Sequence, residues 1–139
     1  MSHITLNLIQ FPETNLKVAS YNRQVTKDLE SKLRFSTLTE NHDKNSFGIE
    51  FYFEIENKDQ SFSLKVKAIA HFISDQEVDE TFLKSSFVRM SAPAIAFPYV
   101  RTFISNLTLN AGYEAVILPS FNFVKLAEEN EGDESNENK

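Results

Sequence analysis

The side chains that could perform chemistry are few and lie far apart in the sequence. The histidines are His3, His42 and His71, and no two of them have the spacing of metal ligands on a helix. No serine has the flanking glycines of a nucleophilic elbow, and there is no glycine-rich loop for phosphate. Cysteine is absent, which excludes disulfides and thiolate ligands. We therefore interpret the protein as a non-enzyme with no metal and no cofactor.

The aromatic content suggests a different kind of activity. The chain has 13 Phe, 4 Tyr and no Trp in 139 residues. Phe buries a large apolar area without a polar group. The excess either fills the core of one small domain or serves an interface, and composition alone leaves both alternatives open.

The negative charge is concentrated at the C-terminus. Residues 128–139 contain six acidic residues and one lysine, so residues 1–127 carry only about −1 of the total charge of −6. We expect one folded domain over residues 1–127 and an acidic, disordered tail over residues 128–139. Nucleic acid is not an expected partner, because there is no basic patch to hold phosphates.

The N-terminus lacks the basic region and apolar run of a signal peptide. The uncharged stretch at residues 90–100 contains two prolines and is too short to cross a bilayer. We expect a cytoplasmic protein that does not insert into membranes.

Two runs of strict alternation predict an antiparallel hairpin. Odd positions from Phe47 to Ile55 are apolar, and even positions from Phe62 to Phe72 are apolar, with the polar residues 57–61 between them. Weaker alternation predicts strands over residues 4–18, interrupted near Pro12, and over residues 29–39. One-sided alternation predicts a sheet with one covered face.

Helical spacing replaces the alternation after Ser74. Residues 75–90 suggest a short helix or an irregular crossover, Pro98 is expected to open the main helix, and Gly112 to end it. Residues 121–129 are expected to form a brief last helix after an extended apolar linker. The fold class is α+β: a four-stranded antiparallel sheet followed by helices packed on one face.

Two segments carry a resemblance to a known family. Phe97-Pro98-Tyr99 with Arg101, and the segment from Pro119 to Phe123, resemble the signature of the SecB export chaperones. The order of the predicted elements also agrees over residues 4–127. The resemblance implies an ATP-independent holdase that binds unfolded or preprotein polypeptides in apolar grooves, and a homo-oligomer, typically a dimer of dimers.

Carried over by resemblance, six residues would line the groove. They are Leu33, Phe35, Phe62, Leu64, Tyr99 and Phe123. The alternative for each is an ordinary place in the core.

Other positions depart from the family. Export members carry acidic residues on the first and fourth strands that dock on the SecA motor, whereas this chain has Asn15, Ala19 and Lys65 there. Coupling to SecA is therefore not expected. Two further functions remain as alternatives: a dedicated chaperone of one protein, such as an antitoxin, and a domain that binds a small apolar ligand.

Overall fold

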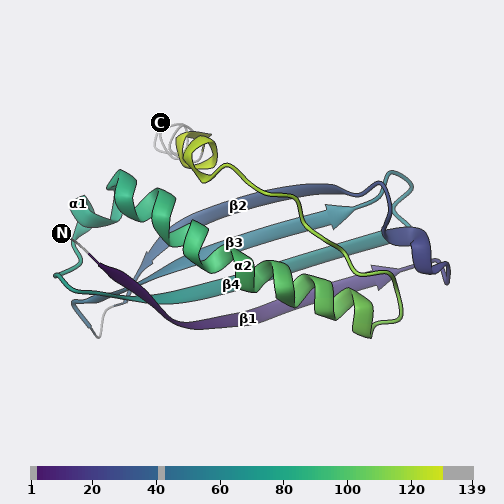
Figure 1. Ribbon diagram of the computed structural model, residues 1–139, viewed down its shortest axis with the longest axis horizontal. Helices are drawn as coiled ribbons and strands as arrows, with labels where there is room; N and C mark the ends of the chain where they lie inside the picture. Colours follow the sequence, from purple (N-terminus) through teal and green to yellow (C-terminus); the bar gives the residue numbers. More distant parts are fainter. Residues whose placement is uncertain (1–2, 41–42, 130–139) are drawn as a thin grey trace.

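The computed structural model describes residues 3–40 and 43–129 of the chain. Its strands are β1 (Ile4–Val18), β2 (Glu30–Thr39), β3 (Ser46–Glu56) and β4 (Phe62–Ser74), with the 3-10 turn η1 (Arg23–Thr26) after β1. The helices α1 (Glu80–Leu83) and α2 (Ser86–Asn110) follow, and residues 123–129 are again helical. Figure 1 shows α2 lying across one face of the sheet. The α+β fold class is confirmed.

The predicted hairpin is the centre of the sheet. The strand order is β1-β4-β3-β2, all neighbours are antiparallel, and Phe51 of β3 lies opposite Ala68 of β4. The odd residues of β3 and the even residues of β4 point to the same face and are almost completely buried. We call this the inner face, because α2 covers it, and the opposite one the outer face. The alternation in the sequence therefore identified the covered face correctly.

Strand β1 is an edge strand interrupted near Pro12, as its proline predicted, and it has another irregularity that was not predicted. The register against β4 shifts between Leu6 and Leu8 and again between Gln10 and Glu13. The second shift contains Pro12, which cannot donate a backbone hydrogen bond to the ladder. The strand nevertheless continues to Val18, so the residues on both sides of the bulge pair with β4.

Helix α2 begins at Ser86, and the prediction that Pro98 opens it is wrong. The Ser85 hydroxyl accepts a hydrogen bond from the Val88 amide at 3.3 Å and caps the helix. Pro93 and Pro98 lie inside the helix, where each removes one backbone hydrogen bond. Burial offsets this loss, because fully buried side chains recur every four residues through both prolines. These are Val88, Ala92, Ala96, Val100, Ile104 and Thr108.

Gly112 ends the helix as predicted. Its φ of +102° is in the left-handed region, and the amide of Tyr113 donates to the Thr108 carbonyl at 3.1 Å. The chain then turns back along α2 toward the start of the helix (Figure 1, yellow-green to yellow). We call residues 113–129 the return segment. Of the predicted tail, Glu128 and Glu129 continue the helical end of this segment, and residues 130–139 lie outside the described residues.

Candidate functional site

Helix α2 presents two different rows of side chains on either side of its buried row. Successive residues are about 100° apart around a helix, so residues four apart form a row and adjacent residues belong to different rows. One row contacts β1 and is called the β1-side row (Phe87, Ser91, Ile95, Tyr99, Phe103). The other contacts the return segment and is called the return-side row (Arg89, Pro93, Phe97, Arg101, Ser105). The two rows therefore belong to two separate surfaces.

The return segment is fastened to the return-side row at both ends. The Ser105 hydroxyl donates to the Val116 carbonyl at 2.6 Å, and an Arg89 Nη atom donates to the Ala127 carbonyl at 3.3 Å. The buried Thr108 hydroxyl adds a bond, since it accepts from the Val116 amide at 2.8 Å. These contacts place the segment antiparallel to α2, with residues 117–126 between the two attachment points.

An aromatic cluster fills the space between the attachment points. The ring centroid of Phe97 lies 5.2 Å from that of Phe121, 5.6 Å from that of Phe123 and 6.2 Å from that of Phe53 on β3. Phe123 continues the cluster to Phe35 on β2, with the ring centroids 6.2 Å apart in an edge-to-face arrangement. Phe121 and Phe123 are half-buried, so the cluster reaches the surface through the return segment.

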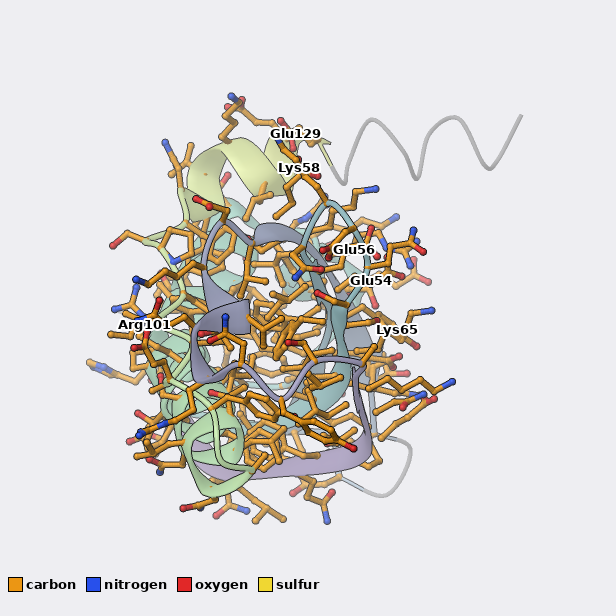
Figure 2. All side chains as sticks on the ribbon, turned by 90° about the vertical axis from the view of Figure 1, so that its right-hand side faces the viewer. Glu54, Glu56, Lys58, Lys65, Arg101 and Glu129 are labelled. Carbon is orange, nitrogen blue, oxygen red and sulfur yellow. The ribbon has the colours of Figure 1, made fainter. Side chains whose placement is uncertain are left out.

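Arg101 occupies the return-side row one turn after Phe97 and one turn before Ser105. Its guanidinium carbon lies 5.1 Å from the centroid of the Phe97 ring, within the range of a cation–π contact. Its Nε atom is buried and has no hydrogen-bond partner among the described residues. A buried donor without a partner costs about 1–3 kcal/mol, and more when it is charged. Figure 2 shows Arg101 on the helix side of the molecule, away from Lys65 and Glu54.

A cavity of about 360 Å³ lies beside the cluster at the edge of the sheet. Residues 35–39 of β2 form one wall, and Glu80, Leu83, Lys84 and Arg89 form the other. Because β2 is an edge strand, one side of its backbone is available to pair with another extended segment. Apolar rings and a free strand edge thus lie next to each other.

The β1-side row borders a second apolar surface. A cavity of about 480 Å³ is lined by His3 and Ile4 together with residues 87–95 of this row. Further along, the Phe103 ring stacks on Phe11 of β1 with the centroids 3.8 Å apart. The exposed fractions of Phe87, Ile95 and Tyr99 are 39%, 40% and 56%, which is high for apolar side chains on one helix flank.

The six residues predicted for a groove fall into three groups. Leu33, Phe35 and Phe123 lie on the return-segment side, where Phe35 and Phe123 are in contact. Tyr99 lies on the opposite flank of α2, in the β1-side row. Phe62 and Leu64 are completely buried on the inner face.

Sequence reasoning missed three residues of this site. Phe97 and Arg101 were used as part of the motif, and Phe121 as part of the second motif segment and of the expected last helix, but none was assigned to the groove. The i, i+4 spacing of Phe97 and Arg101 was a usable signal, because it places both side chains on one helix row.

The outer face of the sheet carries paired charges of both signs. Lys67 lies 3.5 Å from the Glu50 carboxylate, and its ammonium and the Arg34 guanidinium lie 5.6 and 5.7 Å from the Tyr52 ring centroid. A hydrogen bond with Glu50 raises the pKa of the Tyr52 hydroxyl, and the negative charge of Glu50 raises the pKa of Lys67. These charges neutralise one another across the strands.

The positions at which export chaperones are acidic lie at the β1–β4 border. Asn15 pairs with Lys65 in the ladder, and both are exposed. Ala19 follows β1 and is also exposed. The structure thus places an amide, a methyl group and a cation on the accessible surface there.

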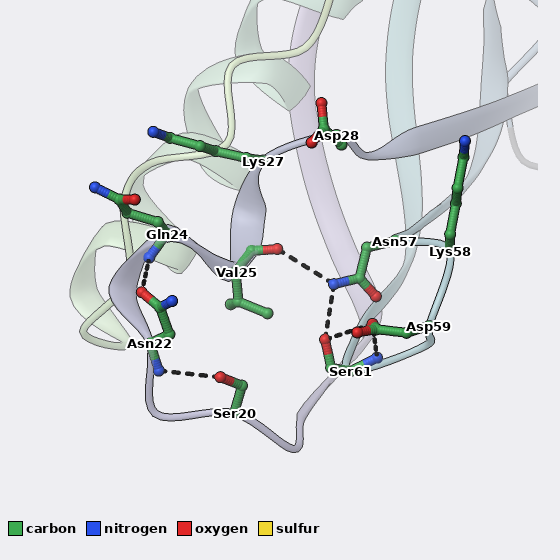
Figure 3. Close-up of a pocket in the computed structure, with 10 residues that line it drawn as sticks. All are labelled: Ser20, Asn22, Gln24, Val25, Lys27, Asp28, Asn57, Lys58, Asp59 and Ser61. Carbon is green, nitrogen blue, oxygen red and sulfur yellow. Dashed lines mark hydrogen bonds between the residues drawn. The ribbon is translucent and has the colours of Figure 1, made fainter.

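A polar cavity of about 430 Å³ lies at the end of the molecule, between η1 and the β3–β4 turn (Figure 3). The Asn57 amide donates to the Val25 carbonyl at 3.3 Å and to the Ser61 hydroxyl at 2.8 Å. The Ser61 hydroxyl in turn donates to Asp59 at 2.7 Å, which lowers the pKa of that carboxyl. These groups form hydrogen bonds with one another, so we interpret the cavity as part of the packing contact between η1 and the β3–β4 turn.

Across residues 3–40 and 43–129, His, Asp and Glu side chains form no group of three or more that could hold a metal ion. Within the same ranges, no helix has the length and apolar character needed to cross a membrane.

Comparison with known proteins agrees with this architecture. The family model described as preprotein translocase subunit SecB matches residues 3–133. The chain belongs to the SecB family. The protein is therefore a member of a chaperone family that is not enzymatic.

Two solved structures resemble this SecB-family chain in fold. One is the SecB-like chaperone Rv1957 of Mycobacterium tuberculosis in complex with a ChAD peptide from the HigA1 antitoxin, at 12% identity and a TM-score of 0.66. That match covers 85% of this chain and 87% of the other. The second is a protein of unknown function from Streptococcus agalactiae, at 10% identity and a TM-score of 0.50, covering 86% and 99% of the two chains. A search of curated proteins found no match.

Proposed function

We propose that this SecB-family protein is an ATP-independent holdase that binds extended, apolar polypeptide segments along the return-segment side of α2. The observation that carries the proposal is the aromatic cluster, which reaches the surface at Phe121 and Phe123 beside the cavity at β2. Apolar burial is non-directional, so such a surface can accept many unrelated segments. The free edge of β2 can form hydrogen bonds with the backbone of a client, and these bonds do not depend on the client's side chains.

Leu33 and Phe35 support this site from the inner face of β2. Both are largely buried, with exposed fractions of 8% and 6%, and Phe35 is also part of the cavity wall. We propose that they contact the client where it enters the cavity. Phe62 and Leu64 would contribute indirectly, because their buried side chains support the strands on which the site is built.

The test is suppression of aggregation. A chemically denatured model protein is diluted into buffer without ATP, and light scattering is followed with and without the purified protein. We expect stoichiometric amounts to reduce the scattering. Undiminished aggregation together with no binding of a labelled apolar peptide would contradict the proposal.

Tyr99 lies in the β1-side row, across α2 from the aromatic cluster, and we propose that a long client also reaches it. Tyr99→Ala is then expected to weaken client binding about fivefold, through loss of one aromatic contact. Its exposed fraction of 56% predicts a change in unfolding free energy within about 0.5 kcal/mol. Peptide binding by fluorescence anisotropy and the melting curve measure the two effects. A lower melting temperature would place Tyr99 in the core, and unchanged peptide binding would remove it from the client surface.

We further propose that the β1 side of the molecule is the surface for self-association. Strand β1 is the second free edge of the sheet, and the half-exposed Phe87 and Ile95 lie close to its N-terminal end. Ile95→Asp should shift the mass in solution toward the monomer, because it places a charge in an apolar contact. Light scattering coupled to size exclusion measures that mass. A monomeric parent protein, or an unchanged oligomer in the variant, would exclude this surface.

The identity of the client separates two roles. Asn15, Ala19 and Lys65 stand where export members carry the acidic residues that dock on SecA, so we propose that export through that motor is not the role of this chain. The structural resemblance to a chaperone bound to an antitoxin peptide favours a dedicated partner as the second candidate. Affinity purification from the native cell distinguishes them: one stoichiometric protein indicates a dedicated partner, and a broad spectrum indicates a general holdase.

A further inference from the structure

We propose that His71 is a protonation-dependent clasp that holds the middle of β1 to the outer face of the sheet. The charged ring binds Glu40 through one nitrogen and Gln10 of β1 through the other, and loss of the ring proton weakens the contact with β1. This inference is independent of the client site, because His71 and Gln10 lie on the outer face.

The first observation is how little backbone pairing holds the middle of β1. The register against β4 shifts between Leu6 and Leu8 and again between Gln10 and Glu13, so residues 8–10 are the three paired residues between the two shifts. Because β1 is an edge strand, it has β4 on one side and no strand of this sheet on the other. A short ladder between two bulges opens more easily than a continuous one, so a side-chain contact there has a measurable effect.

The second observation is that both ring nitrogens of His71 face oxygen atoms. Nδ1 lies 2.6 Å from Oε1 of Glu40, and Nε2 lies 2.9 Å from Oε1 of Gln10. A carboxylate and an amide oxygen can only accept hydrogen bonds, and both ring nitrogens carry a hydrogen only in the charged ring. The contacts are therefore those of an imidazolium. The short distance to Glu40 fits a charge-assisted hydrogen bond.

The third observation is the way in which Glu40 reaches the ring. Glu40 directly follows β2, and β3 lies between β2 and β4. At this level of the sheet β3 has Gly48, which lies opposite Leu38 of β2 on one side and His71 on the other. Since glycine has no side chain, the Glu40 side chain can cross β3 above it. Gly48 is buried although its position belongs to the outer face, as expected for a residue that neighbouring side chains cover.

Other charged groups on this part of the outer face have partners of their own. Glu50 of β3 lies one outer-face position away from the ring and binds Lys67 of β4 at 3.5 Å. From β1, Glu13 lies opposite the same Lys67, beyond the second register shift. Asp43, in the loop after Glu40, accepts hydrogen bonds within that loop. Glu40 is therefore the carboxylate that fixes the ring, and the charge of the ring is what changes with pH.

A neutral ring cannot keep both contacts unchanged. It has one N–H group, and the carboxylate of Glu40 is a stronger acceptor than the amide of Gln10, so the proton stays on Nδ1. Nε2 then presents a lone pair to Oε1 of Gln10, and the best remaining contact is a weaker neutral bond from the rotated amide. The Glu40 end of the clasp stays closed and the β1 end loosens. Histidine changes its charge between about pH 5 and 8, so the contact with β1 should respond to pH in that range.

The experiment measures the clasp at about pH 5.5 and about pH 8.5, near the two ends of that range. A nitrogen–proton spectrum of the His71 ring reports which of its nitrogens carry a proton. We expect both to be protonated at the lower pH and Nδ1 alone at the higher pH. Hydrogen exchange of β1 is followed in the same samples as protection factors, which are corrected for the intrinsic effect of pH on exchange. Protection within residues 8–10 should fall about fivefold at the higher pH, because a neutral hydrogen bond replaces a charge-assisted one.

Two variants and a control identify the ring as the cause. His71→Gln keeps a polar side chain on β4 that does not titrate, so protection within residues 8–10 should be low at both pH values. Gln10→Glu places a carboxylate at each ring nitrogen, so the charged ring and the protection of β1 should both persist to a higher pH. His3→Gln is the matched control, because His3 also adjoins β1 but lies at the cavity beside α2. It should leave the pH response unchanged.

The outcomes decide the proposal directly. Equal protection of residues 8–10 at the two pH values in the parent protein would overturn it, and so would a pH response that persists in His71→Gln. A neutral ring that carries its proton on Nε2 would also overturn it, because the β1 end would then be the one that stays closed. If His71→Gln does not fold, the ring spectrum and the protection factors of the parent protein decide without it.

Discussion

Phe97→Ala is expected to lower the free energy of unfolding by about 3–5 kcal/mol, the usual cost of removing a large aromatic side chain from a core. The exposed fraction of Phe97 is only 6%, and its ring contacts Phe53 on the sheet as well as Phe121 and Phe123 on the return segment. We therefore expect a second effect: the return segment should separate from α2 between its two attachment points. Denaturant unfolding followed by circular dichroism measures the first effect, and hydrogen exchange of residues 121–129 measures the second.

Phe103→Ala is the matched control for this prediction. Phe103 is on the same helix and also stacks on another ring, but it lies in the β1-side row and is half-buried. It should cost less stability and leave hydrogen exchange in the return segment unchanged. If Phe103→Ala releases the return segment to the same extent, the segment is held by general helix stability and not by the aromatic cluster.

The strands were predictable because their signal is local. The alternation in each of the two runs between Phe47 and Phe72 predicts which side chains are buried. The register of β3 against β4 agrees with that prediction. The bulge in β1 was also predictable, because Pro12 lacks the hydrogen that the ladder needs.

The start of α2 was not predictable from the same kind of rule. Proline is common in the first turn of a helix, so Pro98 was a reasonable start on local grounds. The helix extends back to Ser86 because Val88, Ala92 and Ala96 are buried against the sheet. That burial comes from tertiary packing, which a local start signal does not contain.

The predicted site combined residues of two surfaces, because its members were carried over by resemblance and not from their positions around the helix. Phe97 and Tyr99 are two residues apart, and a helix that runs through both places them on opposite flanks. The sequence also could not predict that the Nε atom of Arg101 has no hydrogen-bond partner among the described residues. The surroundings of this atom depend on where the return segment attaches to α2.

The double substitution Phe121→Ala with Phe123→Ala is expected to weaken binding of an apolar peptide about 100-fold and to abolish suppression of aggregation. Each ring contributes apolar area that a client can bury, and about 1.4 kcal/mol per ring corresponds to tenfold in affinity. Both residues are half-buried and lie near the end of the domain, so their loss should affect binding more than folding. Anisotropy of a labelled peptide and light scattering of an aggregating client measure the two activities.

Tyr52→Ala controls for the loss of an aromatic side chain in general. Tyr52 is 38% exposed on the outer face, between Arg34 and Lys67, and should not contribute to client binding. Equal losses in the two variants would mean that clients bind wherever an aromatic ring is accessible. A loss confined to the variant that lacks Phe121 and Phe123 would instead show that holdase activity depends on the aromatic cluster between α2 and β2. On the outer face, the ring of Tyr52 is accessible but lies next to charged side chains.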